Sequence, residues 1–228
     1  MAETAANPAS SDPTAPPPRA AFGSGFADPG PLGLAGFAGT TFFLSAVNSN
    51  MLGASVQTIV LGLALFYGGI AQLLAGMWEF AKGNTFGAVA FSSYGAFWLS
   101  FWYLLNHLPE KAPPKDILHG VGVFLLVWTI FTAYMTIAAL RTNGVLVLVF
   151  VVLLLTFLAL TIGWLSETVP QFAANSNGWI HLGGWLGLIT ALLAWYASFA
   201  GVLNATFSKP IAPMFPLGAT SRTEPVVP

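Results

Sequence analysis

The sequence predicts an all-α integral membrane protein with six transmembrane helices. Hydrophobic residues make up 56% of the 228 residues and charged residues only 7%, whereas soluble domains carry about 25% charged residues. Six apolar stretches, each near the ~20 residues needed to cross a bilayer, lie between two polar, proline-rich ends. So few charges cannot cover the surface of a water-soluble domain, and we expect the lipid bilayer to be the solvent of this chain.

The same composition excludes several classes of protein. A formal net charge of -1 gives no reason to expect a nucleic-acid partner. The absence of cysteine excludes disulfides, thiolate metal sites and a cysteine nucleophile. The first 30 residues contain no apolar run preceded by positive charge, so we expect no cleavable signal peptide.

Three regions follow from the composition along the chain. Residues 1–27, rich in Ala, Pro and Ser, are predicted to be a disordered cytoplasmic tail. Residues 28–207 are predicted to form the six-helix transmembrane domain. Residues 208–228 are expected to be a flexible cytoplasmic tail, because prolines recur after residue 212.

Each span is predicted from its apolar run and from the residues that flank it. The first is the shortest and the richest in glycine, and prolines at 29 and 31 favour a clean helix start. The third follows Lys82-Gly83-Asn84, where Asn84 and Thr85 are suitable helix caps. The six spans are expected at residues 32–48, 56–80, 85–105, 117–140, 145–165 and 180–207.

The basic residues between the spans predict the orientation of the chain. The side that holds both termini has Arg19, Lys82, Arg141, Lys209 and Arg222. The opposite side has Lys111 and Lys115, both in one loop. Positive charge is enriched in cytoplasmic loops, so both termini of this cell-membrane protein are predicted to be cytoplasmic.

Glycines recur at helical spacing in three spans, at 33, 36 and 39, at 62, 69 and 76, and at 183, 184 and 187. Small residues let membrane helices approach closely. Two interpretations stay open: close packing within one subunit, or an interface between subunits.

No charged residue lies in the middle third of any predicted span; Glu79 lies at the cytoplasmic end of the second span beside Lys82. Intramembrane charges mark proton relays and chromophore counter-ions, so a light-driven pump with a lysine-linked chromophore is excluded. Without a His/Asp/Glu cluster we expect no metal, no cofactor and no enzymatic activity.

Neutral polar residues remain as candidates to line a pathway. Thr41, Ser45 and Asn48 share one helical face with Phe37, and Thr40, Gln72 and Ser93 lie in nearby segments. Hydroxyl and amide groups bind a small solute weakly, which suits conduction. The alternative is that such hydroxyls bond to their own backbone or to a neighbouring helix.

One motif is specific enough to indicate a family. The segment Asp28-Pro-Gly-Pro-Leu-Gly-Leu34, followed by Gly36-Phe37, resembles the N-P-A-P-L-G-L signature of the acetate uptake transporter family, also called the GPR/FUN/YaaH family. The stretches 66–80, 83–87, 90–98 and 201–204 also look like segments of that family. Asp28 stands where the family has Asn, and Gly30 where it has Ala; Asp28 adds a negative charge near the cytoplasmic mouth.

This resemblance implies a six-helix subunit that assembles as a homo-hexamer with one pathway in each subunit. It implies transport of acetate and related carboxylates such as succinate, accompanied by protons. The family's narrow apolar constriction matches Phe37, Tyr94 and Leu153 here, and Thr40, Thr41, Ser45, Gln72 and Ser93 are the expected pathway lining. Asp28, Pro29, Pro31 and Gly33 make up the motif that opens the first span.

Two rival functions stay open at this point. One is a channel for another small solute such as ammonium, although ammonium pathways use paired pore histidines and the predicted helix centres have none. The other is a sensor that binds acetate without moving it.

Overall fold

The computed structural model describes residues 25–109, 111–167 and 177–217, and within these ranges six helical spans are long and apolar enough to cross a membrane. The prediction of an all-α membrane protein with six spans is therefore confirmed. The spans are α1 (Gly30–Asn48), a composite second span (Ala54–Lys82), α4 (Thr85–Asn106), α5 (Pro114–Ala139), α6 (Gly144–Ser166) and α7 (Gly178–Thr206).

Local sequence signals explain where the helices begin. The Asn84 side chain caps α4 by accepting a hydrogen bond from Gly87 N (3.2 Å), and Asn143 caps α6 in the same way through Leu146 N (3.0 Å). These caps satisfy backbone donors that have no partner within their own helix. α1 and α5 instead have proline in their first turn, where its missing N–H costs nothing.

The second span is not the single regular helix that the sequence predicts. It consists of η1, a 3-10 turn (Ala54–Ile59), a short α2 (Val60–Gly62), η2, a π-helix (Leu63–Ala71), and α3 (Gln72–Lys82). A π-helical stretch widens the helix locally and is common at functional sites.

Close contact with α1 accounts for this irregularity. The Thr40 hydroxyl donates to Gly36 O (2.9 Å) and also lies 3.4 Å from Leu63 O, the first carbonyl of η2. A Cβ added at Gly68 would lie 2.5 Å from Thr40 Oγ1, so α1 and η2 touch here without room for another side chain. A side chain inserted beside a helix ladder in this way changes the helix geometry.

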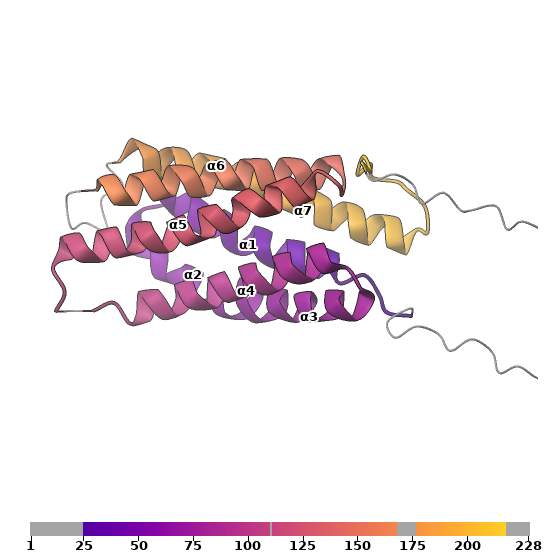
Figure 1. Cartoon of the computed structure of the whole chain (residues 1–228), viewed down its shortest axis with the longest axis horizontal. Coiled ribbons are helices and arrows are strands. Elements are labelled where there is room, and N and C mark those ends of the chain that lie inside the picture. Colours follow the sequence, from indigo (N-terminus) through magenta and orange to yellow (C-terminus); the bar gives the residue numbers. More distant parts are fainter. Residues whose placement is uncertain (1–24, 110, 168–176, 218–228) are drawn as a thin grey trace, which may run out of the picture.

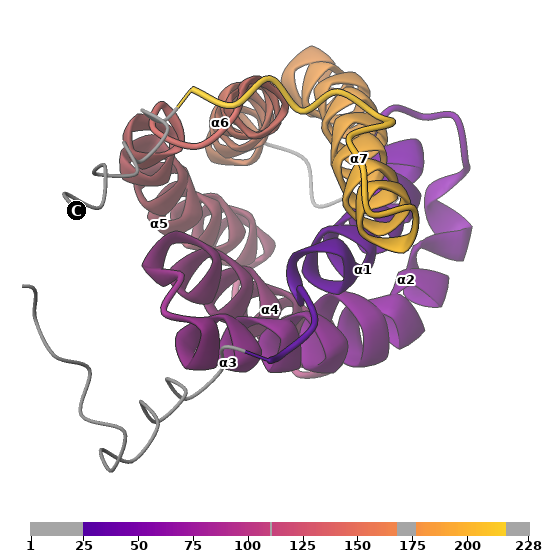
Figure 2. The same cartoon turned by 90° about the vertical axis from the view of Figure 1, so that its right-hand side faces the viewer.

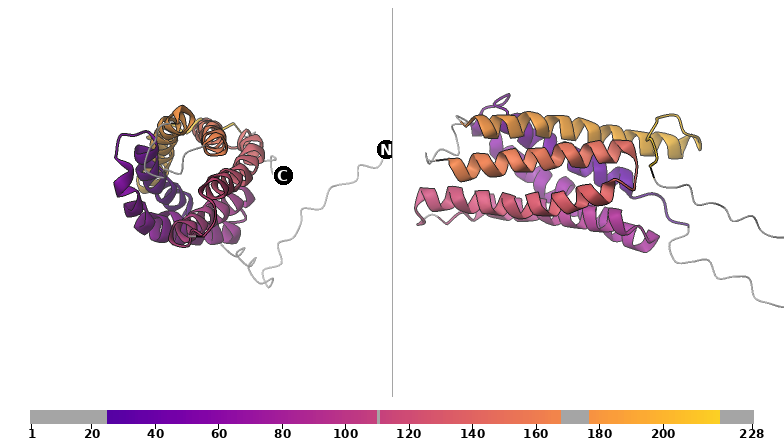
Figure 3. Two further views of the ribbon diagram at one scale, coloured as in Figure 1. Left: turned by 90° about the vertical axis from the view of Figure 1, so that its left-hand side faces the viewer. Right: turned by 45° about the horizontal axis from the view of Figure 1, so that its top comes forward.

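The helices form a closed circuit around the long axis of the bundle. The second span packs on α4, α4 meets α5, and α5, α6 and α7 follow in order before α7 packs on α1. α1 also contacts the second span, which closes the circuit (Figure 2). Figures 1 and 3 show that residues 25 and 217, the two limits of the described chain, lie at the same end of the bundle. We call this the termini end.

The glycine stripes serve mainly the packing of helices within this chain. A Cβ at Gly184 would collide with the backbone of Ser49, and one at Gly76 would lie 2.5 Å from Ser92 N. Nothing lies within 4 Å of a Cβ at Gly62, so the predicted stripe at 62, 69 and 76 is not uniform.

Residues 208–217 differ from the flexible tail predicted for 208–228. The Asn204 side chain accepts from Ile211 N (2.7 Å) and Ala212 N (2.9 Å) and donates to Ala212 O (2.9 Å). Tyr196 Oη donates to Pro213 O, and Gly144 N donates to Phe215 O (both 2.8 Å). This C-terminal strap, residues 208–217, crosses from the end of α7 to the α5–α6 connection (Figure 2). Residues 218–228 lie outside the described part of the chain, as do 1–24 of the predicted N-terminal tail.

Large apolar side chains cover much of the outside of the bundle. Phe66, Val127, Ile130, Ile137 and Leu192 are each more than half exposed. Such faces suit contact with lipid tails or with further subunits.

Candidate functional site

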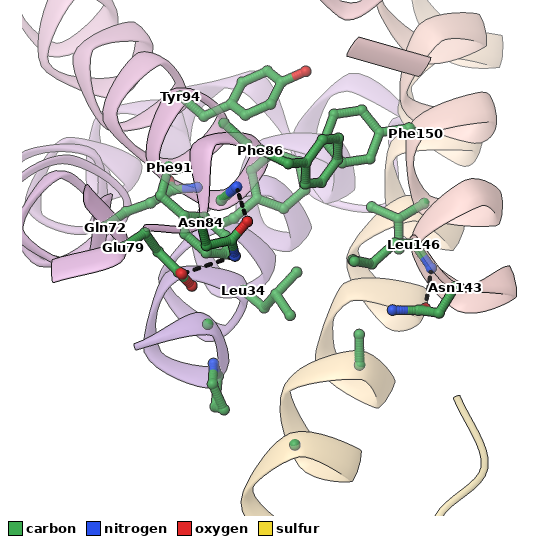
Figure 4. Close-up of a pocket in the computed structure, with 18 of the residues that line it drawn as sticks. Leu34, Gln72, Glu79, Asn84, Phe86, Phe91, Tyr94, Asn143, Leu146 and Phe150 are labelled. Carbon is green, nitrogen blue, oxygen red and sulfur yellow. Dashed lines mark hydrogen bonds between the residues drawn. The ribbon is translucent and has the colours of Figure 1, made fainter. Parts of the chain in front are cut away.

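A cavity of about 180 Å³ opens inside the bundle towards the termini end; we call it the proximal cavity. Its walls come from α1, α3, α4, α6 and α7, and Met214 of the C-terminal strap also lines it. Its lining combines polar groups with aromatic rings (Figure 4). The polar lining residues are Asp28, Gln72, Glu79, Asn84 and Asn143, and the rings are Phe37, Phe86, Phe91, Tyr94 and Phe150.

A smaller cavity of about 40 Å³, the distal cavity, lies further along α1. One face of α1 lines it with Phe37, Thr41, Ser45 and Asn48. These are the residues whose spacing of 4, 4 and 3 predicts a shared helical face. Its other walls are mostly apolar and come from α4 and α6.

Phe37 and Leu153 line both cavities and thus lie between them. Tyr94 lines the proximal cavity, and its ring centroid is 5.6 Å from that of Phe37. All three side chains are at most 5% exposed. The structure therefore brings together the three residues expected to form the constriction.

Several contacts hold the Tyr94 ring in place. Its hydroxyl forms a 2.9 Å hydrogen bond with Thr132 Oγ1 of α5, in which either oxygen can be the donor. The ring packs edge-on against Phe131 (5.2 Å between centroids) and lies 6.1 Å from Phe150. Three other helices thus fix the position of one side chain of α4, because Phe37 belongs to α1, Phe150 to α6, and Thr132 and Phe131 to α5.

The polar residues expected to line the pathway divide into two groups. Gln72 lines the proximal cavity, and Thr41 and Ser45 line the distal one. The buried atoms Gln72 Oε1 and Thr41 Oγ1 have no hydrogen-bond partner among the described residues. Thr40 and Ser93 line neither cavity, and Thr40 is fully buried in the contact between α1 and η2.

The motif that opens α1 forms one rim of the proximal cavity. Asp28 Oδ1 accepts a hydrogen bond from Gly30 N (3.1 Å) and pairs with Lys82 Nζ (2.9 Å), so the charge of Asp28 has a local partner. Pro31 lines the cavity and its carbonyl accepts from Ser198 Oγ of α7 (2.7 Å). Pro29 is buried, and Gly33 leaves room for the ring of Phe91.

Glu79 also lines the proximal cavity. From the sequence alone, this residue is placed at the end of the second span without an assigned function. Its side chain is only 2% exposed, and its Oε2 accepts a hydrogen bond from Asn84 Nδ2 (2.8 Å; Figure 4). The signal in the sequence was a lone acidic residue inside an otherwise uncharged apolar span, a feature that marks function in membrane helices.

The hydrogen-bonding groups that line the two cavities suit a small organic solute. Amide, hydroxyl and carboxyl groups stand beside aromatic walls. No group of three or more His, Asp or Glu residues that could bind a metal ion occurs in the described ranges.

Comparison with known proteins places the chain in a family. The model of the GPR1/FUN34/yaaH family matches residues 11–219. Acetate permease A of Emericella nidulans is 41% identical over 208 residues, which cover 86% of this chain and 69% of that protein. The succinate-acetate/proton symporter SatP of Escherichia coli is 40% identical over 192 residues, which cover 82% of this chain and 95% of that protein.

A solved structure described as that of the bacterial acetate channel SatP superimposes with a TM-score of 0.72 at 38% sequence identity. The match covers 83% of this chain and 99% of the solved one. The chain is thus a multi-pass membrane protein and a member of the GPR1/FUN34/yaaH family.

Proposed function

We propose that this protein moves acetate and related small carboxylates such as succinate across the membrane, together with protons, through a pathway inside each subunit. The observation that most supports this proposal is the pair of cavities that meet at Phe37 and Leu153 within one six-helix bundle. Relatives named as an acetate permease and a succinate-acetate/proton symporter support the choice of solute. The function is transport, without a catalysed reaction.

In this proposal, Phe37, Tyr94 and Leu153 form a dry constriction that limits the size of the solute. Neutral polar groups on either side, Gln72 in one cavity and Thr41 and Ser45 in the other, replace part of its hydration shell. Such groups bind weakly enough for the solute to leave. Hydrated inorganic ions are disfavoured, because their charge would lose its water at the ring of apolar side chains.

We further propose that both termini face the cytoplasm and that subunits assemble as a hexamer. The basic residues Lys82, Arg141 and Lys209 belong to the termini end, whereas Lys111 and Lys115 belong to the opposite end. The exposed apolar faces of the bundle provide surface for contact between subunits and with lipid.

Uptake of labelled succinate into liposomes that contain the purified protein tests the transport function, with and without an inward proton gradient. We expect uptake above that of empty liposomes, competition by unlabelled acetate, and stimulation by the gradient. Succinate is preferred to acetate as the label because a dicarboxylate crosses the lipid itself more slowly. Absence of uptake by correctly folded protein under both conditions would contradict transport and favour a sensor that binds without moving the solute.

A further inference from the structure

The proximal cavity has an acidic lining, which is unexpected for a pathway that admits carboxylates. Asp28 and Glu79 line it, and no Lys, Arg or His is among its described lining residues. Like charges repel strongly where water is scarce. A carboxylate solute can therefore share this cavity with Glu79 only if a proton reduces the total negative charge.

The two acidic residues differ in how their charge is compensated. The Asp28 side chain is 53% exposed, pairs with Lys82 Nζ at 2.9 Å and accepts the Gly30 N–H. Its negative charge is thus balanced by a cation, a backbone donor and water.

Glu79 has much less of this compensation, since the nearby charge of Lys82 acts on it only from a distance. It forms no ion pair with a described Lys, Arg or His, and Lys82 on its own helix is directed to Asp28. Its one hydrogen bond comes from the neutral amide of Asn84. A carboxyl group that is 98% buried with a single neutral donor favours the uncharged form, because burial of an unpaired charge is costly.

The helices around Glu79 supply no other charge to balance it. From α4, Gly87 packs directly on the Glu79 side chain, where an added Cβ would lie 2.8 Å from Glu79 Cδ. From α1, Glu79 Oε1 lies 3.5 Å from the position of a Cβ at Gly30, at the helix start that also carries Asp28. The opposite wall contributes the neutral Asn143 from the start of α6 and Gly201 from α7.

We propose that Glu79 is the proton-carrying residue of this transporter and that it protonates the carboxylate solute in the proximal cavity. This inference rests on the proposed function. The O–H bond of the Glu79 carboxyl group breaks and an O–H bond to the solute carboxylate forms. Glu79 is left as a carboxylate that accepts the hydrogen bond of Asn84 Nδ2.

The solute then passes Phe37, Tyr94 and Leu153 with one charge fewer, and the Glu79 carboxylate takes a new proton from hydronium in the solution at the cavity mouth. One proton thus moves with each carboxylate, and no other reactant is needed. Proton transfer lies on the termini side of the constriction and is reversible. A solute that leaves from this side is protonated before it meets the apolar ring, and a solute that arrives from the opposite side passes the ring protonated and returns its proton to Glu79.

Glu79→Gln tests this role, because glutamine keeps the size and the hydrogen bond to Asn84 but cannot release a proton. The matched control is Asp116→Asn, the same change at an exposed position at the start of α5 and far from the cavity. Both variants of the full-length protein are compared with the wild type in liposomes. The readouts are labelled succinate uptake from mildly acidic to neutral pH and proton entry reported by a trapped dye. Elution on size exclusion and helical circular dichroism establish that each variant is folded.

We expect Glu79→Gln to lower uptake at neutral pH about 100-fold, the lower end of what a positioned proton donor contributes. Uptake should recover at acidic pH, where the bulk supplies protonated solute, and Asp116→Asn should behave as wild type. A wild-type pH profile for Glu79→Gln, or an equal loss at every pH, would overturn the proton role while leaving transport intact. Failure of the wild type itself to take up succinate would instead reject the proposed function and, with it, this inference.

Infrared spectroscopy of the purified protein at neutral pH provides a readout independent of transport. We expect a carbonyl stretch of a protonated carboxyl group that is present in the wild type and in Asp116→Asn and absent from Glu79→Gln. If the wild type lacks this band, Glu79 holds no proton and the proposal is wrong.

Discussion

Tyr94 combines two functions that belong to different parts of its side chain. The ring stands against Phe37 beside the point where the two cavities meet. The hydroxyl reaches away to Thr132 and attaches α4 to α5. Because the two parts can be removed separately, packing at the constriction and anchoring of the helix are experimentally distinguishable.

Tyr94→Ala should widen the constriction, and Tyr94→Phe should not. We expect the alanine variant to raise uptake of a larger carboxylate such as butyrate relative to acetate, and Phe37→Ala to act in the same direction. Tyr94→Phe keeps the ring and should keep the butyrate-to-acetate ratio, while unfolding becomes easier by about 1 kcal/mol through the lost hydrogen bond. Competition uptake assays give the ratio; an unchanged ratio in both alanine variants would remove these residues from the constriction.

At the scale of the element, the second span shows what the sequence predicts and what it leaves open. An apolar run with few charges predicts that a helix crosses the bilayer, because that depends only on length and composition. The π-helical geometry of η2 depends on Thr40 and Gly36 of another helix, and no local signal in 63–71 reports that contact. The span was therefore predictable and its internal geometry was not.

The candidate site follows the same division. The sequence predicts the positions of Phe37 and Tyr94 and the shared face of Thr41 and Ser45. Each of these predictions depends on a motif or a helical spacing within a single segment of the chain. The burial of Glu79 was not predictable, because it results from Gly30 and Gly87 on two other helices. Thr40 shows the opposite outcome. Its polar side chain suggested that it lines the pathway, whereas in the structure its hydroxyl bonds to carbonyl groups where α1 contacts η2.

Gly36→Ala should separate α1 from η2, whereas Gly62→Ala should be tolerated. A Cβ at Gly36 would lie 2.5 Å from the carbonyl oxygen of Tyr67, a backbone atom that cannot rotate away, while a Cβ at Gly62 meets nothing within 4 Å. We expect the first variant to lose several degrees of thermal stability in detergent through a cost of about 1–3 kcal/mol, the usual range for overpacking. Thermal unfolding monitored by intrinsic fluorescence measures both; equal stability of the two variants would contradict the close approach.

At the scale of the whole molecule, hydroxyl groups connect the helices around the circuit. Five of the six contacts between neighbouring spans have such a bond among the described residues, and the sixth, between the second span and α4, is packed through Gly76 and Ser92 instead. The five are Tyr94–Thr132 (α4 to α5), Thr129–Thr161 (α5 to α6), Thr156–Thr190 (α6 to α7), Ser198 to Pro31 O (α7 to α1) and Thr40 to Leu63 O (α1 to η2). The sequence left open whether these hydroxyl groups line a solute pathway or bond helices to one another. Most of them bond helices to one another, and only a few line the cavities.

Removal of one such pair should have a modest and non-additive effect. Thr161→Val leaves Thr129 without its partner on α6, and the double variant Thr129→Val/Thr161→Val leaves neither hydroxyl unpaired. We expect a coupling free energy of about 0.6 kcal/mol, as is typical of hydrogen bonds between membrane helices. A double-mutant cycle on the free energy of unfolding in detergent gives this value, and strictly additive losses would show that the bond contributes nothing.

The C-terminal strap should be released when Asn204 is replaced by alanine, because three hydrogen bonds from one side chain hold residues 211 and 212. The natural chain has no cysteine, so Met214→Cys provides a unique label site on the wall of the proximal cavity. We expect Asn204→Ala to speed its reaction with a water-soluble maleimide about tenfold, which corresponds to roughly 1.4 kcal/mol of lost anchoring. As a control, Lys115→Cys, exposed at the other end of the bundle, should react at the same rate with and without Asn204→Ala. If the reaction rate at Met214→Cys is also the same with and without Asn204→Ala, other contacts hold the strap.

The order in which a ribosome makes this chain gives the C-terminal strap a further meaning. Residues 208–217 are translated after all six spans, yet Met214 forms part of the cavity wall and Phe215 is attached to the start of α6. The helices can enter the bilayer and meet one another while this wall is still absent. The mouth of the cavity is therefore finished by the last described residues to be synthesised, and a nascent chain arrested after α7 would have every membrane span in place but an incomplete site.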